Sequence, residues 1–179
     1  MTNLITGASS GIGEALAYAL AKRGDKLFIC GRDKARLKAV AERCNAEWAV
    51  VDVADAKATA EWIRKANEKH PIDRVFANAG VSTGEENDKN VRNTFAVNVG
   101  GCVNTVLPAI EIFSRRNPPN QTIDRKNRPT IVITASIAGY GPLKACPSYS
   151  ATKACVKTWG LSLRGYLAPK GINVSAICP

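Results

Sequence analysis

The sequence is poor in metal-binding residues, because it contains one histidine, His70, and its six cysteines form no C-x-x-C pair. A zinc site is therefore not expected. No apolar run approaches the ~20 residues that a membrane-spanning helix needs, and the N-terminus has neither a basic segment nor a signal cleavage site. We expect a cytoplasmic protein that has free thiols and no membrane partner.

Basic charge, in contrast, is abundant: 25 lysines and arginines against 15 acidic residues give a net charge of +10. Such a charge can indicate nucleic-acid binding. The basic residues are nevertheless dispersed along the chain, apart from a cluster between Arg115 and Arg128, and no RNA- or DNA-binding motif accompanies them. We therefore expect no nucleic-acid partner, and attraction of a polyanionic cofactor accounts for the charge equally well.

A chain of 179 residues with 45% hydrophobic residues can form one domain with a buried core, which we assign to residues 1–179. Short apolar runs predict strands at residues 4–6, 27–30, 48–51, 75–77, 131–135 and 172–177. Longer segments between them predict helices at residues 13–23, 34–44, 56–69, 91–113 and 149–168. Most of these strands are apolar without alternation, as in a sheet buried on both faces. The pattern predicts an α/β fold with a doubly wound parallel sheet.

Local signals mark the segments between these elements. Asp33 and Asp55 are suited to cap the N-termini of two helices, and Gly24 is suited to end the first helix. Residues 114–129 hold three prolines and five basic residues without periodicity, which predicts an exposed basic loop. This loop is either a solvated insertion or a docking surface for an acidic partner.

The first predicted strand runs into a glycine-rich turn, residues 6–13 with the sequence TGASSGIG, where a helix starts. Glycine lets a backbone approach a pyrophosphate closely, and the N–H groups of a helix N-terminus attract phosphates. The spacing is G-x-x-x-G-x-G rather than the general dinucleotide fingerprint G-x-G-x-x-G. A tight connection without a ligand is the alternative. The cofactor-binding candidates in this turn are Gly7, Ser9, Ser10, Gly11, Ile12 and Gly13.

Tyr149 and Lys153 are four residues apart in a predicted helix, so their side chains lie on one face, one turn apart. In isolation such a pair is most simply an accidental neighbourhood on a surface helix. Chemistry offers a second interpretation, because a free phenol has a pKa of about 10 and an adjacent ammonium favours its ionised form. The phenol can then exchange a proton with a substrate near neutral pH.

Five features in register along the whole chain resemble the short-chain dehydrogenase/reductase family. They are the T-G-x-x-x-G-I-G turn at 6–13, Asn78-Ala79-Gly80 after the fourth predicted strand, Asn98, Ser136, and Tyr149-x-x-x-Lys153. The resemblance implies a Rossmann-type fold. It also implies NAD(P)(H)-dependent oxidation of alcohols or reduction of carbonyls.

Within such a reaction, the polar candidates take complementary roles. Hydride transfer to a carbonyl carbon leaves charge on the oxygen, which Tyr149 can protonate and which the hydroxyl of Ser136 can hold. The resemblance implies that Lys153 also binds the nicotinamide ribose and that Asn98 holds a water in a proton relay. The competing interpretations are a helix-capping serine for Ser136 and a satisfied buried amide for Asn98.

The remaining cofactor candidates follow the predicted strands. By resemblance, Asn78, Ala79 and Gly80 border the cofactor, although they could form a plain turn. Asp52 and Val53 resemble the pair that flanks the adenine, although Asp52 could simply end a strand.

The choice between NADP(H) and NAD(H) depends on the end of the second strand. An NAD enzyme usually has an acidic residue there, whereas this chain has Arg32, whose guanidinium can bind a 2′-phosphate. Asp33 is the helix cap in this interpretation. Ser10 is not the basic residue that many NADP(H) enzymes of the family carry in the glycine turn. We predict NADP(H), with NAD as the alternative.

The chain ends at Pro179, where the family continues through a glycine into a substrate lid, a helix and a seventh strand. We expect a single domain that lacks the family's last strand and lid, as a fragment or as a shortened relative. The resemblance implies a homo-oligomer and a small carbonyl or alcohol substrate of unread identity. Two alternatives to the oxidoreductase remain: an NADP(H)-binding sensor, and an epimerase or dehydratase, which would usually show G-x-x-G-x-x-G.

Overall fold

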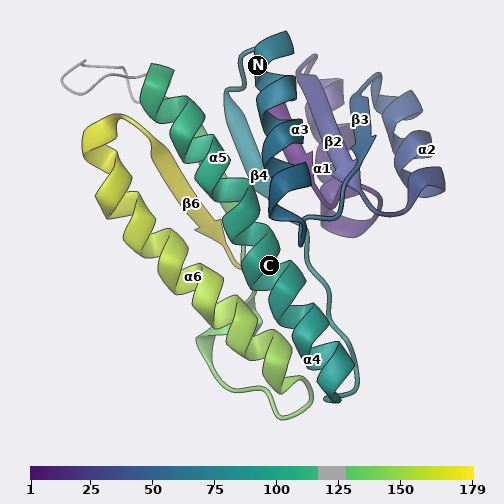
Figure 1. The fold of residues 1–179 in the computed structure, drawn as a ribbon, viewed down its shortest axis with the longest axis vertical. Coiled ribbons are helices and arrows are strands. Elements are labelled where there is room, and N and C mark those ends of the chain that lie inside the picture. Colours follow the sequence, from purple (N-terminus) through teal and green to yellow (C-terminus); the bar gives the residue numbers. More distant parts are fainter. Residues whose placement is uncertain (117–127) are drawn as a thin grey trace.

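The computed structural model describes residues 1–116 and 128–179, which contain one six-stranded parallel sheet in the order β3-β2-β1-β4-β5-β6 (Figure 1). The strands are β1 (Thr2–Thr6), β2 (Lys26–Gly31), β3 (Glu47–Val50), β4 (Arg74–Ala77), β5 (Thr130–Thr134) and β6 (Asn173–Ile177). The register pairs Ile5 with Ile29 and Val75 with Ile131, so apolar residues meet across the sheet centre. The predicted Rossmann-type doubly wound sheet is confirmed.

Helices cover both faces of this sheet. They are α1 (Gly11–Lys22), α2 (Lys34–Cys44), α3 (Ala56–Lys69), α4 (Asp88–Phe95), α5 (Gly101–Arg116) and α6 (Pro147–Leu167). Apolar residues of α3, α5 and α6 share one core cluster with the sheet, and those of α1 and α2 share another on the opposite face (Figure 1). Burial on both faces explains why the strands are apolar throughout.

Most boundaries lie within two residues of their predicted positions. Asp33 accepts a hydrogen bond from the Arg36 N–H, and Asp55 accepts one from the Ala58 N–H, so both cap helices as predicted. Gly24 has a φ of +78° and follows Arg23, the C-cap of α1, as expected of a glycine that ends a helix.

The helix predicted at residues 91–113 is wrong in two respects. It begins earlier, at Asp88, because Asn87 caps α4 by accepting from the Asn90 N–H. It is also not uniform, since a π-helical segment, Ala96–Gly100, separates α4 from α5. A π-helical turn holds an additional residue, and such turns are frequent at functional sites.

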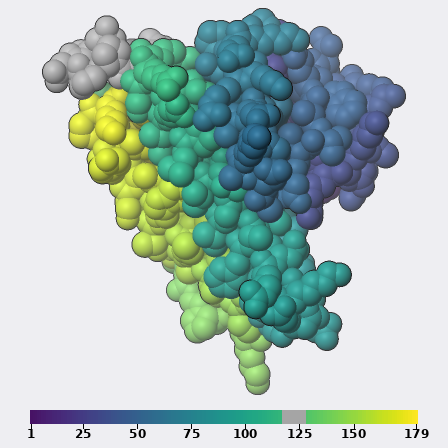
Figure 2. Space-filling view, in the orientation of Figure 1, coloured from purple at the N-terminus to yellow at the C-terminus, as the bar shows by residue number. Residues whose placement is uncertain are grey.

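The last long helix and the basic loop also differ from prediction. α6 starts at Pro147, two residues before Tyr149, because proline is tolerated in the first turn. Residues 114–116 of the predicted loop belong to α5, where the Arg115 guanidinium lies 2.7 Å from the Glu111 carboxylate. Residues 117–127 of the prediction lie outside the described residues, and at its end Pro129 is buried directly before β5 rather than exposed. Between β5 and α6, the light green segment projects at the lower end of the molecule (Figure 2).

One helical stretch, Asp88–Arg116, is long and apolar enough to cross a membrane by length and composition, contrary to the expectation from the sequence that no segment would be. Of the 18 consecutive residues with the highest mean hydropathy in this stretch, 44% are buried inside the protein. Val106, Ala109 and Phe113 pack in the core cluster beside α3 and α6. A helix that is buried in a protein core can have the same length and hydropathy as one that crosses a membrane.

Candidate active site

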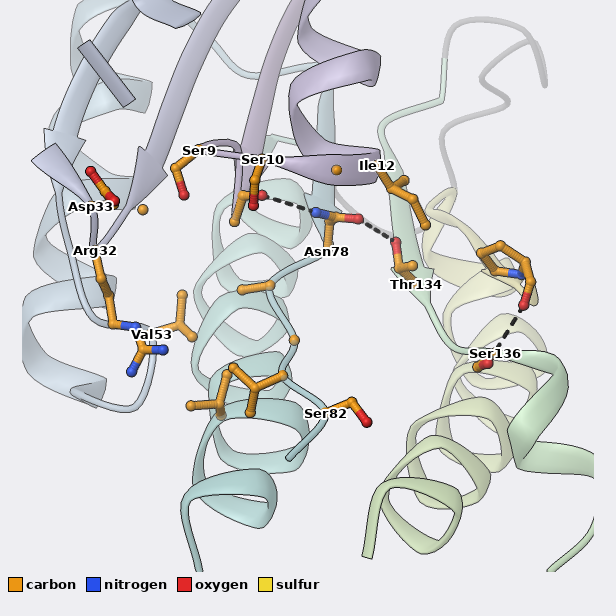
Figure 3. A pocket seen from close by; sticks show the side chains of 18 of the residues that line it. Ser9, Ser10, Ile12, Arg32, Asp33, Val53, Asn78, Ser82, Thr134 and Ser136 are labelled. Atoms are coloured by element: carbon orange, nitrogen blue, oxygen red, sulfur yellow. Dashed lines mark hydrogen bonds between the residues drawn. The ribbon is translucent and has the colours of Figure 1, made fainter. Parts of the chain in front are cut away.

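A cavity of about 630 Å³ opens at the carboxyl ends of β1, β2, β4 and β5 (Figure 3). The strand order reverses direction between β1 and β4, and this is where open α/β sheets bind ligands. Two groups of predicted residues meet there, the glycine turn and the Tyr149–Lys153 pair, although more than 130 residues separate them in the sequence.

The glycine turn packs so closely that side chains are excluded. A Cβ atom on Gly13 would overlap the carbonyl oxygen of Gly7, and one on Gly7 would lie 2.6 Å from the Cα of Ala79. Gly7 also has a φ of +69°, which favours glycine. Ser10 precedes α1, and its side chain makes no capping bond within the described chain. The N-terminus of α1 therefore presents N–H groups at the cavity wall, where they can bind a phosphate.

Asn78 joins the ends of three strands. Its Nδ2 donates to the carbonyl oxygens of Thr6 (3.1 Å) and Gly7 (3.3 Å). Its Oδ1 accepts from the Thr134 hydroxyl at 3.2 Å (Figure 3). Together with Ala79 and Gly80, it also lines the cavity. The segment is thus more than a plain turn, because it fixes the glycine turn against β5.

Tyr149 and Lys153 both line the cavity from α6. The Nζ of Lys153 lies 5.7 Å from the centroid of the Tyr149 ring and donates to the carbonyl oxygen of Thr134 at 2.8 Å. Lys153 is only 4% exposed, and this burial lowers the pKa of its ammonium. A Cβ on Gly80 would lie 3.3 Å from the Nζ, so glycine at this position makes room for the amine.

Asn98 lies behind the cavity wall, in the π-helical segment. Its Oδ1 accepts from the Val81 N–H at 2.7 Å, and its Nδ2 donates to the Val81 carbonyl (2.9 Å) and the Thr152 hydroxyl (3.0 Å). The Thr152 hydroxyl in turn donates to the carbonyl oxygen of Tyr149 at 2.8 Å. Asn98 is therefore a satisfied buried amide that braces α6, and its role in a proton relay remains a prediction.

Ser136 caps a helix, as one of its two interpretations predicts, and its role in holding a substrate oxygen remains a prediction. Its Oγ accepts from the Ala138 N–H at 3.2 Å and so caps a 3₁₀ helix, Ile137–Tyr140. The same oxygen lies in the cavity wall, 3.5 Å from the carbonyl oxygen of Pro179 (Figure 3).

At the other end of the cavity, charged side chains replace the buried polar ones. The Arg32 guanidinium is half exposed and lies 3.8 Å from the Asp52 carboxylate. Asp33 accepts from the Arg36 backbone N–H at 3.0 Å and from the Arg36 Nε at 2.6 Å. These two donors lower the pKa of the Asp33 carboxyl.

Two predicted cofactor residues do not reach the cavity. Gly13 lies beneath the turn, and Asp52 uses its carboxylate to accept from the Ala54 N–H at 3.0 Å, while its neighbour Val53 lines the wall.

Sequence reasoning missed several wall residues, which are Gly31, Asp33, Arg36, Val51, Val81, Ser82, Val97, Thr134, Ala135 and Pro179. Most are apolar or small, and no motif distinguishes them from core residues. Only Asp33 and Arg36 carried a signal, as the cap and first turn of α2.

The family model described as short chain dehydrogenase matches residues 2–179. An uncharacterized oxidoreductase of Myxococcus xanthus is 37% identical over 99% of this chain and 70% of its own length. The probable oxidoreductase EphD of Mycobacterium tuberculosis is 30% identical over 98% of this chain, which spans 30% of that protein.

Solved structures agree with this result. A 3-ketoacyl-(acyl-carrier-protein) reductase of Brucella melitensis, complexed with NADH, superposes with a TM-score of 0.89 at 28% identity, over 99% of this chain and 74% of that one. Serine dehydrogenase of Escherichia coli also gives a TM-score of 0.89, at 26% identity, over 100% of this chain and 82% of that one.

Proposed function

Because the chain belongs to the short-chain dehydrogenase family, we propose that it interconverts a carbonyl and an alcohol by hydride transfer with a nicotinamide dinucleotide. The observation that carries the proposal is the meeting of the glycine turn with Tyr149 and Lys153 in one cavity. The turn and the N-terminus of α1 fit a pyrophosphate, since they offer a close backbone and N–H groups.

Ser136, Tyr149 and Lys153 line one end of the cavity, which we call the catalytic end. In the proposed reaction each of them has a role in the transfer of the proton. The bound cofactor supplies the hydride for the carbonyl carbon. Tyr149 then donates its hydroxyl proton to the carbonyl oxygen, and the nearby ammonium of Lys153 stabilises the phenolate that remains. Ser136 donates a hydrogen bond to the same oxygen and holds it in place. In the oxidation direction, the phenolate accepts the proton of the alcohol.

For the cofactor we propose a preference for NADP(H). Arg32 stands at the rim of the cavity with an exposed guanidinium, which can pair with a 2′-phosphate. Asp33 is the acidic residue at this rim, and both of its carboxylate oxygens are engaged by Arg36. A carboxylate paired in this way is less free to bind a ribose hydroxyl and repels a phosphate less.

The test is a turnover assay that follows the loss of NADPH or NADH absorbance with a panel of aldehydes, ketones and β-keto esters. The β-keto esters are included because two solved relatives are named for substrates with oxygen on the third carbon, a 3-ketoacyl group and serine. We expect turnover with NADPH and its loss in Tyr149→Phe. Cofactor binding without turnover of any compound would favour the sensor instead.

We also propose a homo-oligomer, formed through α5 and α6. Leu107, Leu161 and Tyr166 are large apolar side chains on these helices, and each is more than half exposed. Light scattering after size-exclusion chromatography should give a mass of at least two chains. A monomer at micromolar concentration would contradict this assembly.

A further inference from the structure

The helix that carries Tyr149 has no cap of its own. Cys146 occupies the N-cap position of α6, and its side chain makes no capping bond within the described residues. The next residue, Pro147, has no N–H to donate. The first N–H group of the helix therefore belongs to Ser148, whose side chain is buried. A buried donor at a helix N-terminus needs an acceptor from elsewhere in the fold.

Glu86 provides that acceptor from a distance of 62 residues along the chain. Its Oε1 accepts from the Ser148 N–H at 3.0 Å and from the Ser148 hydroxyl at 2.7 Å. Carboxylates at helix N-termini are favoured both by these bonds and by the helix dipole. Glu86 thus does for α6 what Asp33 does for α2, but from another element.

Glu86 is connected to the catalytic end of the cavity through the residues that precede it in the chain. It closes the segment 81–86, whose residues Val81 and Ser82 line the cavity wall. The start of the same segment is bound through Val81 to Asn98, and Asn98 is bound to Thr152 on α6. Tyr149 therefore lies between two attachments of its own helix, at Ser148 and at Thr152.

We propose that Glu86 is a positioning residue for the reaction: through Ser148 it fixes the first turn of α6 and thereby the hydroxyl of Tyr149. The proposal rests on the proposed function, in which Tyr149 donates the proton. Proton transfer requires heavy-atom distances near those of a hydrogen bond, so a small displacement of the phenol slows it.

The experiment compares Glu86→Ala with the matched control Glu85→Ala, using NADPH and the carbonyl compound of the panel that the unmodified protein reduces fastest. The Glu85 carboxylate accepts only from the Asn87 side chain among the bonds of the described residues and does not contact α6. We expect kcat to fall on the order of tenfold in Glu86→Ala. The Kd of NADPH should stay unchanged, because Glu86 lies outside the cavity wall. Glu85→Ala should leave both constants within about twofold.

Two further variants separate positioning from general stability. Glu86→Gln keeps an amide oxygen for both bonds, so it should recover most of kcat. Ser148→Ala removes the hydroxyl bond to Glu86 and keeps the N–H bond, whereas Glu86→Ala removes both. The two substitutions should therefore be non-additive in kcat, since they share the hydroxyl–carboxylate contact. Equal effects of the Glu85 and Glu86 substitutions on kcat, additive effects, or a lower melting temperature with unchanged kcat would each overturn the proposal.

Failure of the proposed function has a different signature. Full turnover in Tyr149→Phe, or no turnover of any compound by the unmodified protein, would refute the function and this inference with it. A loss of turnover in Tyr149→Phe with no difference between the Glu85 and Glu86 variants would refute the positioning role alone.

Discussion

The two ends of the cavity are built on different physical principles, with Ser136 at one end and Arg32 at the other (Figure 3). At the catalytic end, Asn98 and Lys153 are almost fully buried and are held by bonds to backbone carbonyls and hydroxyls. At the rim, Arg32 and Arg36 form ion pairs in which the guanidinium side chains are 52% and 64% exposed.

This difference sets how each end should respond to change. A buried polar atom without a partner costs much free energy, so the catalytic end admits few alternative arrangements. Exposed charges are screened by water and salt, and their pairs contribute little to stability. The pairs at the rim can therefore be displaced by the cofactor phosphate that we propose there, whereas the buried polar groups keep one geometry.

The largest effect is expected at the catalytic end, from Tyr149→Phe. The variant keeps the ring but removes the proton donor, so kcat should fall about a thousandfold while the Kd of NADPH stays within about twofold. Steady-state rates and fluorescence titration of NADPH measure the two constants. Comparable turnover in the variant would place the proton donor elsewhere.

The second-largest effect is expected from a substitution in the close-packed glycine turn. In Gly13→Ala the new Cβ would overlap the Gly7 carbonyl oxygen, so we expect a loss of about 1–3 kcal/mol in the free energy of unfolding, measured in urea. Gly165→Ala is the control, because a Cβ at that position of α6 meets no atom of the described residues within 4 Å. The control should gain up to about 1 kcal/mol from its better helix propensity. Equal stabilities of the two variants would contradict the close packing of the turn.

At the rim, Arg32→Ala should raise the Kd of NADPH about tenfold and leave the Kd of NADH nearly unchanged. The difference should shrink as salt concentration rises, because Arg32 is exposed. Arg92→Ala, which removes an exposed arginine paired with Asp88, controls for net charge. An equal loss of affinity for both cofactors would refute the assignment of Arg32 to the 2′-phosphate.

The smallest effect is a pH dependence at Asp33. The N–H and guanidinium of Arg36 lower the pKa of its carboxyl in the folded state, so the ionised form stabilises the fold above the unfolded pKa. This contribution is lost as the pH falls through the lowered folded pKa. Asp33→Asn should thus be slightly less stable than the unmodified protein at pH 7, and the stabilities of the two proteins in urea should converge as the pH falls through the lowered pKa of the folded state. A difference that does not change with pH would contradict the ion pair.

The glycine turn and the helix caps could be predicted from the sequence because their signals are local. The glycine turn can be recognised from residues 6–13 alone, since Gly7 and Gly13 are needed where backbones touch. Asp33 and Asp55 cap helices through bonds to residues three positions away. The π-helical segment around Asn98 was missed because no local pattern distinguishes it from an ordinary helix.

The sequence by itself determined the alternation of strands and helices, the glycine turn and the one-turn spacing of Tyr149 and Lys153, because each of these depends on neighbours within a few residues. Only the tertiary structure decided which groups hold the candidate site in place. Thr134 bonds to Lys153, Thr152 bonds to Asn98, and Glu86 bonds to the start of α6. These bonds join residues 19 to 62 positions apart. The choice of partner is made when the strands pair and burial forces each polar atom to find an acceptor or donor.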